Sequence, residues 1–319
     1  MDVKPLVSIC CITYNHELFI RQCLDGLIAQ QTDFPFEILV HDDASTDRTQ
    51  DIIKEYEAKY PEVIKPVLQT QNQYSKGVRG INLHFNFPRA KGQYIALCEG
   101  DDYWTDPRKL QRQIDFLEHH ADYVLTCGGF TKVHDGVGES VMVSGLVSKD
   151  LEDEKGFKFT LEDLSKRWIT KTLTCVFRND SDLFNQLLNY TYIRDIHLFY
   201  HMLKEGPGYY FKQLFGVYNI HGGGIFSSTA ATDRFNTHCL IYRELYEVNR
   251  DEFSRQMYFK VLLDIISFNR SNTSGSAFKT NKTAFQAIRL AKTGREIFNF
   301  LKAFIPKQRV QAVKRALNR

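Results

Sequence analysis

Strand-like and helix-like segments alternate between residues 6 and 127, and this alternation is the strongest constraint on the fold. Short, buried-type apolar runs, rich in β-branched residues, predict strands at 6–13, 36–41, 63–69, 93–98 and 122–127. Amphipathic stretches between these runs predict helices at 17–30, 47–60, 80–91 and 107–120. A β-α-β alternation of this kind predicts an α/β domain with a mainly parallel sheet and helices on both faces.

Polar residues directly follow three of the predicted strands. The first strand leads into a Thr-Tyr-Asn sequence, the second into Asp-Asp and the fourth into Glu-Gly-Asp-Asp: Thr13, Tyr14, Asn15, Asp42, Asp43, Glu99, Gly100, Asp101 and Asp102. The carboxyl ends of parallel strands meet at one edge of the sheet, where such sheets bind ligands. We therefore expect these side chains to line a single site.

The adjacent carboxylates of Asp101 and Asp102 indicate a metal. Neighbouring carboxylates repel each other, and a divalent cation relieves the repulsion. Mg²⁺ or Mn²⁺ bound by one or two carboxylates usually also binds the phosphates of a substrate. The alternative is that these residues form a turn before Pro107 and that Asp102 or Thr105 only caps the helix that starts there.

The sequence also limits how a nucleotide could be bound. It contains no G-x-G-x-x-G after the first strand and no G-x-x-x-x-G-K-[ST] motif, which disfavours dinucleotide dehydrogenases and P-loop NTPases. Tyr14 could instead stack on a base while Asp43 accepts a hydrogen bond from it. The alternative is that Tyr14 packs at the end of a strand and Asp43 caps a helix.

These motifs resemble the family-2 glycosyltransferases, which have a GT-A fold. The resemblance covers residues 5–130. More specifically, the motifs resemble those of the bacterial subgroup with an EGDDYW signature, which is found in capsule and lipopolysaccharide assembly. It resumes at Arg194-Asp195 and at Tyr-Asn-Ile-His-Gly-Gly-Gly, residues 218–224. It implies inverting transfer of a sugar from a nucleotide-sugar, usually a UDP-sugar, to a hydroxyl of a glycan or lipid-linked glycan acceptor.

The resemblance also assigns roles to individual residues. Asp195 matches the catalytic base, and Asp102 with His221 would ligate Mn²⁺ or Mg²⁺. The donor would be bound by residues on the same edge of the sheet: Thr13, Tyr14, Asn15, Asp43, Arg79, Asp101, His221 and Gly222.

Two positions in this assignment leave alternatives open. Asn219 stands where the family often has arginine, and Arg79 or Lys76 could supply that charge. Trp104 could stack on an acceptor sugar or pack in the core.

The remainder of the chain is predicted to be a second domain. We expect a GT-A catalytic domain over 1–228 and a helical region over 229–319, ending in helices at 283–304 and 307–318. From Arg289 onward there are nine basic residues and one acid, against 32 basic and 37 acidic residues before it. The basic amphipathic tail could bind an anionic membrane, pack on the catalytic domain or pair with a second subunit. It is too short and too poor in aromatics to indicate nucleic acid.

Composition and the N-terminal sequence bear on where the protein is located in the cell. No apolar run reaches the roughly 18–20 residues that cross a bilayer, and the N-terminus lacks the pattern of a signal peptide. The seven cysteines have no metal-like spacing and fit a reducing compartment. We expect a cytoplasmic protein, or one at the inner face of the cell membrane. The competing functions are a nucleotidyltransferase and a non-catalytic nucleotide-sugar-binding scaffold.

Overall fold

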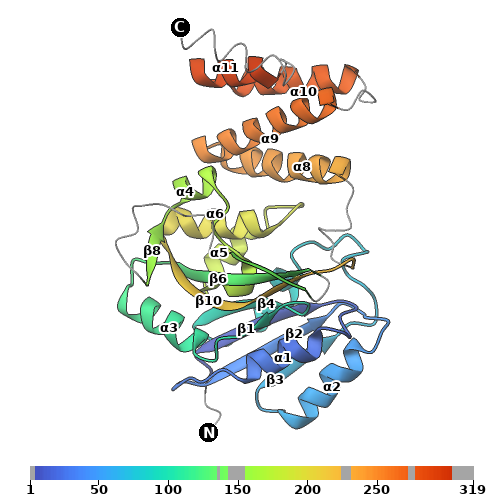
Figure 1. Cartoon of the computed structure of the whole chain (residues 1–319), viewed down its shortest axis with the longest axis vertical. Helices are drawn as coiled ribbons and strands as arrows, with labels where there is room; N and C mark the ends of the chain where they lie inside the picture. The colour runs from blue at the N-terminus through green and yellow to red at the C-terminus, as the bar shows by residue number, and fades with distance from the viewer. Residues whose placement is uncertain (1–3, 135–136, 143–154, 224–230, 272–276, 304–319) are drawn as a thin grey trace. The chain divides into compact units, whose positions relative to one another are not determined.

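The computed structural model describes residues 4–134, 137–142, 155–223, 231–271 and 277–303. The chain divides into two compact units, Met1–Ser227 and Ser228–Arg319. The first unit is built around a curled β-sheet, and the second consists of helices (Figure 1).

A single sheet organises the first unit. Its strands are β1 (Val7–Thr13), β2 (Phe36–Asp42), β3 (Ile64–Leu68), β4 (Tyr94–Glu99), β5 (Tyr103–Trp104), β6 (Leu125–His134), β7 (Val137–Met142), β8 (Gly156–Phe159), β9 (Val176–Arg178) and β10 (Gly208–Ile220). The α-helices are α1 (Ile20–Ile28), α2 (Thr49–Lys59), α3 (Lys109–His119), α4 (Leu161–Lys166), α5 (Ser181–Leu187) and α6 (Asp195–Glu205).

The strand order is β3-β2-β1-β4-β9-β6-β10-β5. β1 lies between β2 and β4 and is parallel to both, so that Thr13 pairs with Asp42 and Ile12 pairs with Glu99. β9 is antiparallel to β4 and β6, whereas β6 and β10 are parallel. The predicted mainly parallel α/β fold is confirmed, with one strand inserted between β4 and β6.

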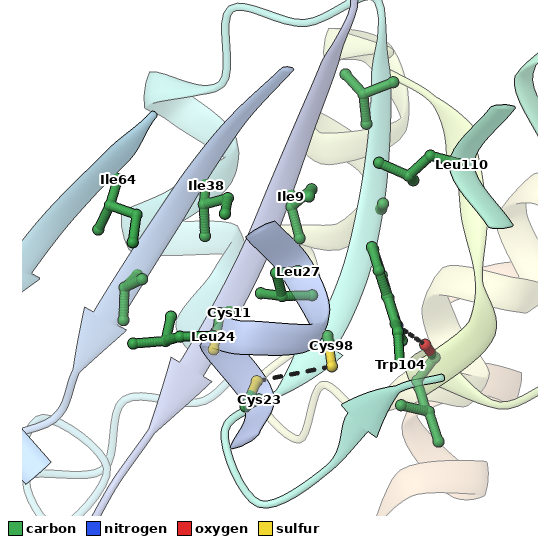
Figure 2. Close-up of a cluster of buried hydrophobic side chains, with 14 of the residues drawn as sticks. Ile9, Cys11, Cys23, Leu24, Leu27, Ile38, Ile64, Cys98, Trp104 and Leu110 are labelled. Carbon is green, nitrogen blue, oxygen red and sulfur yellow. Dashed lines mark hydrogen bonds between the residues drawn. The ribbon is translucent and has the colours of Figure 1, made fainter. Parts of the chain in front are cut away.

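The core beside β1 follows from its alternation of side chains. Val7, Ile9 and Cys11 point to one face and are fully buried against apolar residues of the neighbouring strands and of α1, α2 and α3. Figure 2 shows this cluster, in which the Sγ atoms of Cys23 and Cys98 lie 3.9 Å apart. All seven cysteines are free thiols.

Several elements differ from the sequence-based expectation. The helix expected at 80–91 is a π-helical turn, Asn82–Asn86, followed by a 3₁₀ turn, Phe87–Arg89. Asn86 is buried and donates a hydrogen bond to the Cys11 carbonyl, an interaction that no periodicity predicts. The sequence of residues 209–220 predicts two short strands, but the structure forms a single strand there, β10, with register shifts around Leu214.

The second unit contains α8 (Ala231–Asn249), α9 (Glu252–Ser271), α10 (Ala277–Leu290) and α11 (Gly294–Ala303). The prediction of a single helix at 283–304 is wrong, because α10 ends at Leu290 and a separate helix, α11, begins at Gly294. Arg255 is 2% exposed and joins these helices by hydrogen bonds to Glu252, Glu296 and the Leu290 carbonyl. The helix expected at 307–318 lies outside the described residues. None of the described helices is long and apolar enough to cross a membrane.

Trp104 and Lys109 form an unusual pair in the core of the first unit. Trp104 is 3% exposed, and its indole N–H donates to the Leu173 carbonyl at 2.7 Å (Figure 2). The Lys109 amine is fully buried 3.8 Å from the centroid of the Trp104 ring. Trp104 therefore packs in the core, and the structure corrects the expectation that it offers a stacking surface to an acceptor.

Lys109 makes the stability of the fold depend on pH. Its Nζ has no hydrogen-bond partner among the described residues, and burial lowers its pKa to about 7. The unfolded chain binds this proton below its ordinary pKa near 10.5, whereas the folded chain binds it only below about 7. The free energy of unfolding should therefore rise with pH between these two values.

We predict that Lys109→Met removes this rise. The slope of unfolding free energy against pH should fall by up to about 1.4 kcal/mol per pH unit between neutral pH and pH 10. Urea denaturation over this range measures it. The exposed Lys91 provides the control, because Lys91→Met should leave the slope unchanged. Equal slopes in wild type and Lys109→Met would contradict the prediction.

Candidate functional site

The loops that follow β1 and β2 are held together at the carboxyl edge of the sheet. Asn15 and Ala44 both have positive φ, at 54° and 63°. The Asn15 N–H donates to Ser45 Oγ, and the Thr46 N–H donates to Asn15 Oδ1, each at 2.8 Å. These bonds offset the strain of the left-handed conformation and fix the two loops relative to each other.

Three side chains converge beside these loops. Nε2 of His221, at the end of β10, lies 3.2 Å from Asp101 Oδ2, and Nε2 of His16 lies 3.9 Å from the same oxygen. One ligand atom from each residue lies within 4.8 Å of the others. Two imidazoles and a carboxylate are a donor set that suits a divalent metal ion.

Neighbouring residues orient this cluster. Thr13 Oγ1 lies 3.1 Å from Nδ1 of His16, and the His16 N–H donates to Thr49 Oγ1. The Phe19 ring packs on the His221 ring with centroids 4.5 Å apart. Burial lowers the pKa of His16, and the nearby Asp101 opposes that shift only in part.

Asp102 does not join the cluster. It is 1% exposed, and its Oδ1 accepts a 2.9 Å hydrogen bond from the Asn219 N–H. Asn219 also donates through Nδ2 to the Asp101 carbonyl, so it ties β10 to the Asp101–Asp102 turn. Burial, with Asp101 and Glu99 nearby, raises the pKa of Asp102. The structure thus differs from the expected pairing of Asp102 with His221: the carboxylate beside His221 belongs to Asp101.

The residues expected to bind the nucleobase lie on the same edge. Tyr14 is 43% exposed, which leaves its ring accessible to a ligand. Asp43 is 5% exposed and accepts hydrogen bonds from the N–H groups of Gln73 and Tyr74. Each carboxylate oxygen of Asp43 keeps a second lone pair for a ligand donor.

Tyr74 connects Asp43 to the remaining loops. The Arg79 guanidinium lies 4.0 Å from the Tyr74 ring centroid and donates to the Tyr74 carbonyl. Arg194, the residue before Asp195, donates to the Tyr74 hydroxyl at 3.1 Å. Arg79 also borders a cavity of about 490 Å³, lined by Gly77, Val78, Arg79, His84, Phe85, Tyr190 and Thr191.

A second group of charges surrounds Lys171. Its amine lies 3.5 Å from the centroid of the Tyr218 ring. Desolvation lowers the pKa of Lys171, but the acidic groups of Tyr218, Glu99, Asp102 and Asp195 together raise it. Burial raises the pKa of Glu99 to about 7, and one of its carboxylate oxygens has no hydrogen-bond partner among the described residues.

Asp195 is the first residue of α6, where the helix dipole favours a negative charge. Its side chain is reached by solvent, yet the protein atoms around it raise its pKa, and Lys171 and then Arg194 oppose that shift. The interaction with Lys171 joins Asp195 to the same charge network as Glu99 and Asp102. An accessible carboxylate with a raised pKa is suited to accept a proton.

The glycines after His221 are only partly described. A Cβ at Gly222 would meet no atom within 4 Å, so packing does not require glycine there. The N–H of Gly223 donates to Nδ1 of His221 at 3.3 Å. The donor role of Gly222 stays a prediction, and Gly224 lies outside the described residues.

Comparison with known proteins shows that the chain is similar to glycosyltransferases. The family model "Glycosyl transferase family 2" matches residues 8–178. The Mycobacterium tuberculosis protein Rv1520, named only as uncharacterized, is 48% identical over 120 residues, which cover 36% of this chain and 32% of that protein. The match thus spans about a third of that relative. The putative teichuronic acid biosynthesis glycosyltransferase TuaG of Bacillus subtilis is 27% identical over 64% of this chain and 74% of its own length.

Solved structures share the fold. Residues 1–349 of S. aureus TarS, in complex with UDP-GlcNAc, align with a TM-score of 0.61 and 20% identity, over 90% of this chain and 81% of that fragment. The mannosyltransferase PcManGT of Pyrobaculum calidifontis, in complex with GDP-Man and Mn²⁺, aligns with a TM-score of 0.53 and 14% identity, over 94% and 86% of the two chains. These likenesses confirm the predicted GT-A fold. The match of the family model over more than half of the sequence shows that this chain belongs to glycosyl transferase family 2.

Proposed function

We propose that this chain transfers a sugar, with inversion, from a nucleotide-diphosphate sugar to a hydroxyl of a glycan or lipid-linked glycan during surface polysaccharide synthesis. The observation that carries the proposal is the placement of Asp101, flanked by two imidazoles, on the same edge of the sheet as Tyr14 and Asp43. That edge could hold a base, a diphosphate and a metal ion together.

The relatives support this proposal. TuaG is named for teichuronic acid biosynthesis, and TarS and PcManGT were solved with UDP-GlcNAc and with GDP-Man. We favour UDP as the nucleotide because of the family resemblance. We also place the chain in the subgroup with the EGDDYW signature, on the strength of residues 99–104.

Asp101 and His221 would hold a divalent cation, Mn²⁺ or Mg²⁺. Their donor atoms are 3.2 Å apart and reachable by one ion. When bound, the cation would stabilise the negative charge that develops on the departing nucleoside diphosphate. Thr13 and Asn15 shape the loop beside this site, and Gly222 would let backbone approach the phosphates.

Asp195 would act as the general base. Its carboxylate accepts the proton of the acceptor hydroxyl while that oxygen attacks the anomeric carbon on the face opposite the leaving group. One base is sufficient for inversion. Tyr14 would stack on the nucleobase of the donor, and Asp43 would accept a hydrogen bond from an N–H group of that nucleobase. Arg79, which is held by the loop around Tyr74, would lie beside it.

We predict that Asp195→Asn lowers kcat by about 10²–10⁴-fold and leaves nucleotide affinity unchanged, because the amide cannot accept the proton. Transfer from a panel of UDP- and GDP-sugars, with calorimetric titration of the nucleotide, measures both quantities. The exposed Asp122 is the matched control, and Asp122→Asn should retain full activity.

The competing functions give different results. A scaffold would bind the nucleotide-sugar without turnover in wild type. A nucleotidyltransferase, incubated with a nucleoside triphosphate and a sugar phosphate, would join them into a nucleotide-sugar and release pyrophosphate from the triphosphate.

Lys171 generates a prediction about pH. Its positive charge opposes the raised pKa of Asp195, so Lys171→Met should raise that pKa further. The base must be ionised to act, and activity therefore falls as pH drops through its pKa. The acid limb of the kcat/KM profile should move to higher pH in Lys171→Met and return toward wild type in Lys171→Arg. A drop in rate without a shift of the limb would assign Lys171 a purely structural role.

We also propose peripheral contact of the second unit with the cytoplasmic face of an anionic membrane. Phe285, Ile288 and Ile297 are 62%, 39% and 44% exposed. Residues 277–303 contain six basic residues and a single acid, Glu296, which binds Arg255. Apolar side chains among cations suit a surface of anionic lipid.

Phe285→Glu should weaken binding to phosphatidylglycerol vesicles by about tenfold or more, because it loses apolar burial and adds a repelled charge. Vesicle sedimentation at low and high salt measures this. Val248, which is 44% exposed on α8, gives the control Val248→Glu. If both variants bind alike, or if wild type forms a dimer and ignores vesicles, the exposed face serves a second subunit.

A further inference from the structure

We propose that His16 is a third metal ligand, so that this chain binds Mn²⁺ in preference to Mg²⁺ before any nucleotide arrives. The inference rests on the proposed function, because it concerns the cation that Asp101 and His221 would hold. His16, in the loop after β1, would add a third protein ligand, and the cation would then be able to bind before the nucleotide.

The geometry places three donor atoms around one point. Oδ2 of Asp101 lies 3.2 Å from Nε2 of His221 and 3.9 Å from Nε2 of His16. Adjacent ligands of an octahedral ion at 2.0–2.1 Å are about 3 Å apart. Small side-chain rotations would therefore bring all three atoms onto one face of an ion.

The surroundings of His16 are those of a ligand held ready. Thr13 Oγ1 lies 3.1 Å from Nδ1 and can accept its proton, which leaves Nε2 unprotonated and directed toward Asp101. The His16 N–H is bound by Thr49 Oγ1 at 2.8 Å, so the backbone is fixed by the α2 side of the site. Ring and backbone are thus both positioned without a metal.

His221 is held from another direction. The Phe19 ring packs on it with centroids 4.5 Å apart, which keeps its Nε2 near Asp101. The Gly223 N–H approaches Nδ1 of His221 at 3.3 Å. Binding of a cation at Nε2 would require the ring proton to move to Nδ1 and would replace this weak contact.

The donor set determines which ion is preferred. Mg²⁺ favours oxygen ligands and gives up water reluctantly. Imidazole nitrogen favours transition-metal ions, and two histidines with one carboxylate leave three positions of an octahedral ion open. The diphosphate of a nucleotide could then still bind the ion. A site with a single protein carboxylate would instead depend on the nucleotide to complete it.

Electron paramagnetic resonance of Mn²⁺ tests the inference without catalysis. The wild-type chain should bind one Mn²⁺ in the absence of nucleotide, and Mg²⁺ should compete poorly. His16→Ala should weaken this binding by about tenfold or more. Its electron spin echo should show coupling to one imidazole nitrogen instead of two. His119, exposed at the end of α3, gives the control His119→Ala, and melting curves establish that each variant is folded.

The outcomes separate this inference from the proposed function. Binding of Mn²⁺ only when UDP is present, or two coupled nitrogens retained in His16→Ala, would overturn the role of His16 and leave the donor site intact. Absence of Mn²⁺ binding both with and without UDP would overturn the metal site itself. Equal affinities for Mn²⁺ and Mg²⁺ would contradict the proposed preference.

Discussion

The parallel pairing of β1 with β2 and β4 is the constraint on which the site depends. Because Thr13 pairs with Asp42 and Ile12 with Glu99, three loops leave the sheet at the same level. The loop after β1 contributes the Tyr14 ring and the His16 imidazole, and the loops after β2 and β4 contribute the carboxylates of Asp43 and Asp101. A shift of one residue in either pairing would turn these side chains to the other face.

Backbone strain and buried acidic groups, which both destabilise a fold, occur together at this site. Asn15 and Ala44 adopt left-handed conformations, and the acids Glu99 and Asp102 are enclosed with raised pKa values. The positive charge of Lys171 lies close to these acids and to Asp195. The hydrogen bonds between the first two loops and the bonds from Asn219 keep this arrangement in one geometry. Such strain is common where a protein is organised around a ligand.

Sequence periodicity predicted the parallel half of the sheet because each strand there is a continuous apolar run followed by a turn. The sequence at 172–177 also predicts a strand, which overlaps the start of β9. β5 was not predicted, because it is short and takes its place through pairing with a distant strand. The π-helical turn at 82–86 was not predicted either, because its Asn86 is buried and donates a hydrogen bond to the distant Cys11 carbonyl. Local pattern carries no information about such long-range partners.

The site was predicted in outline but not in detail. Residue order predicted that the loops after β1, β2 and β4 meet at one edge of the sheet, as they do. It could not tell which of the two adjacent aspartates faces His221, because this depends on the hydrogen bond from Asn219 to Asp102. His16 follows Asn15 directly and could have been included on the same argument as its neighbours. Lys171 carried no local signal, since its acidic partners come from three other segments of the chain.

The role of Asp101 is best tested by calorimetric titration of UDP into the wild-type chain and into Asp101→Asn, each with and without Mn²⁺. We expect Mn²⁺ to strengthen UDP binding in wild type and to have no such effect in Asp101→Asn, while Asp122→Asn behaves as wild type. Equal UDP affinity with and without the ion in the wild-type chain, or an undiminished effect of Mn²⁺ in Asp101→Asn, would contradict it.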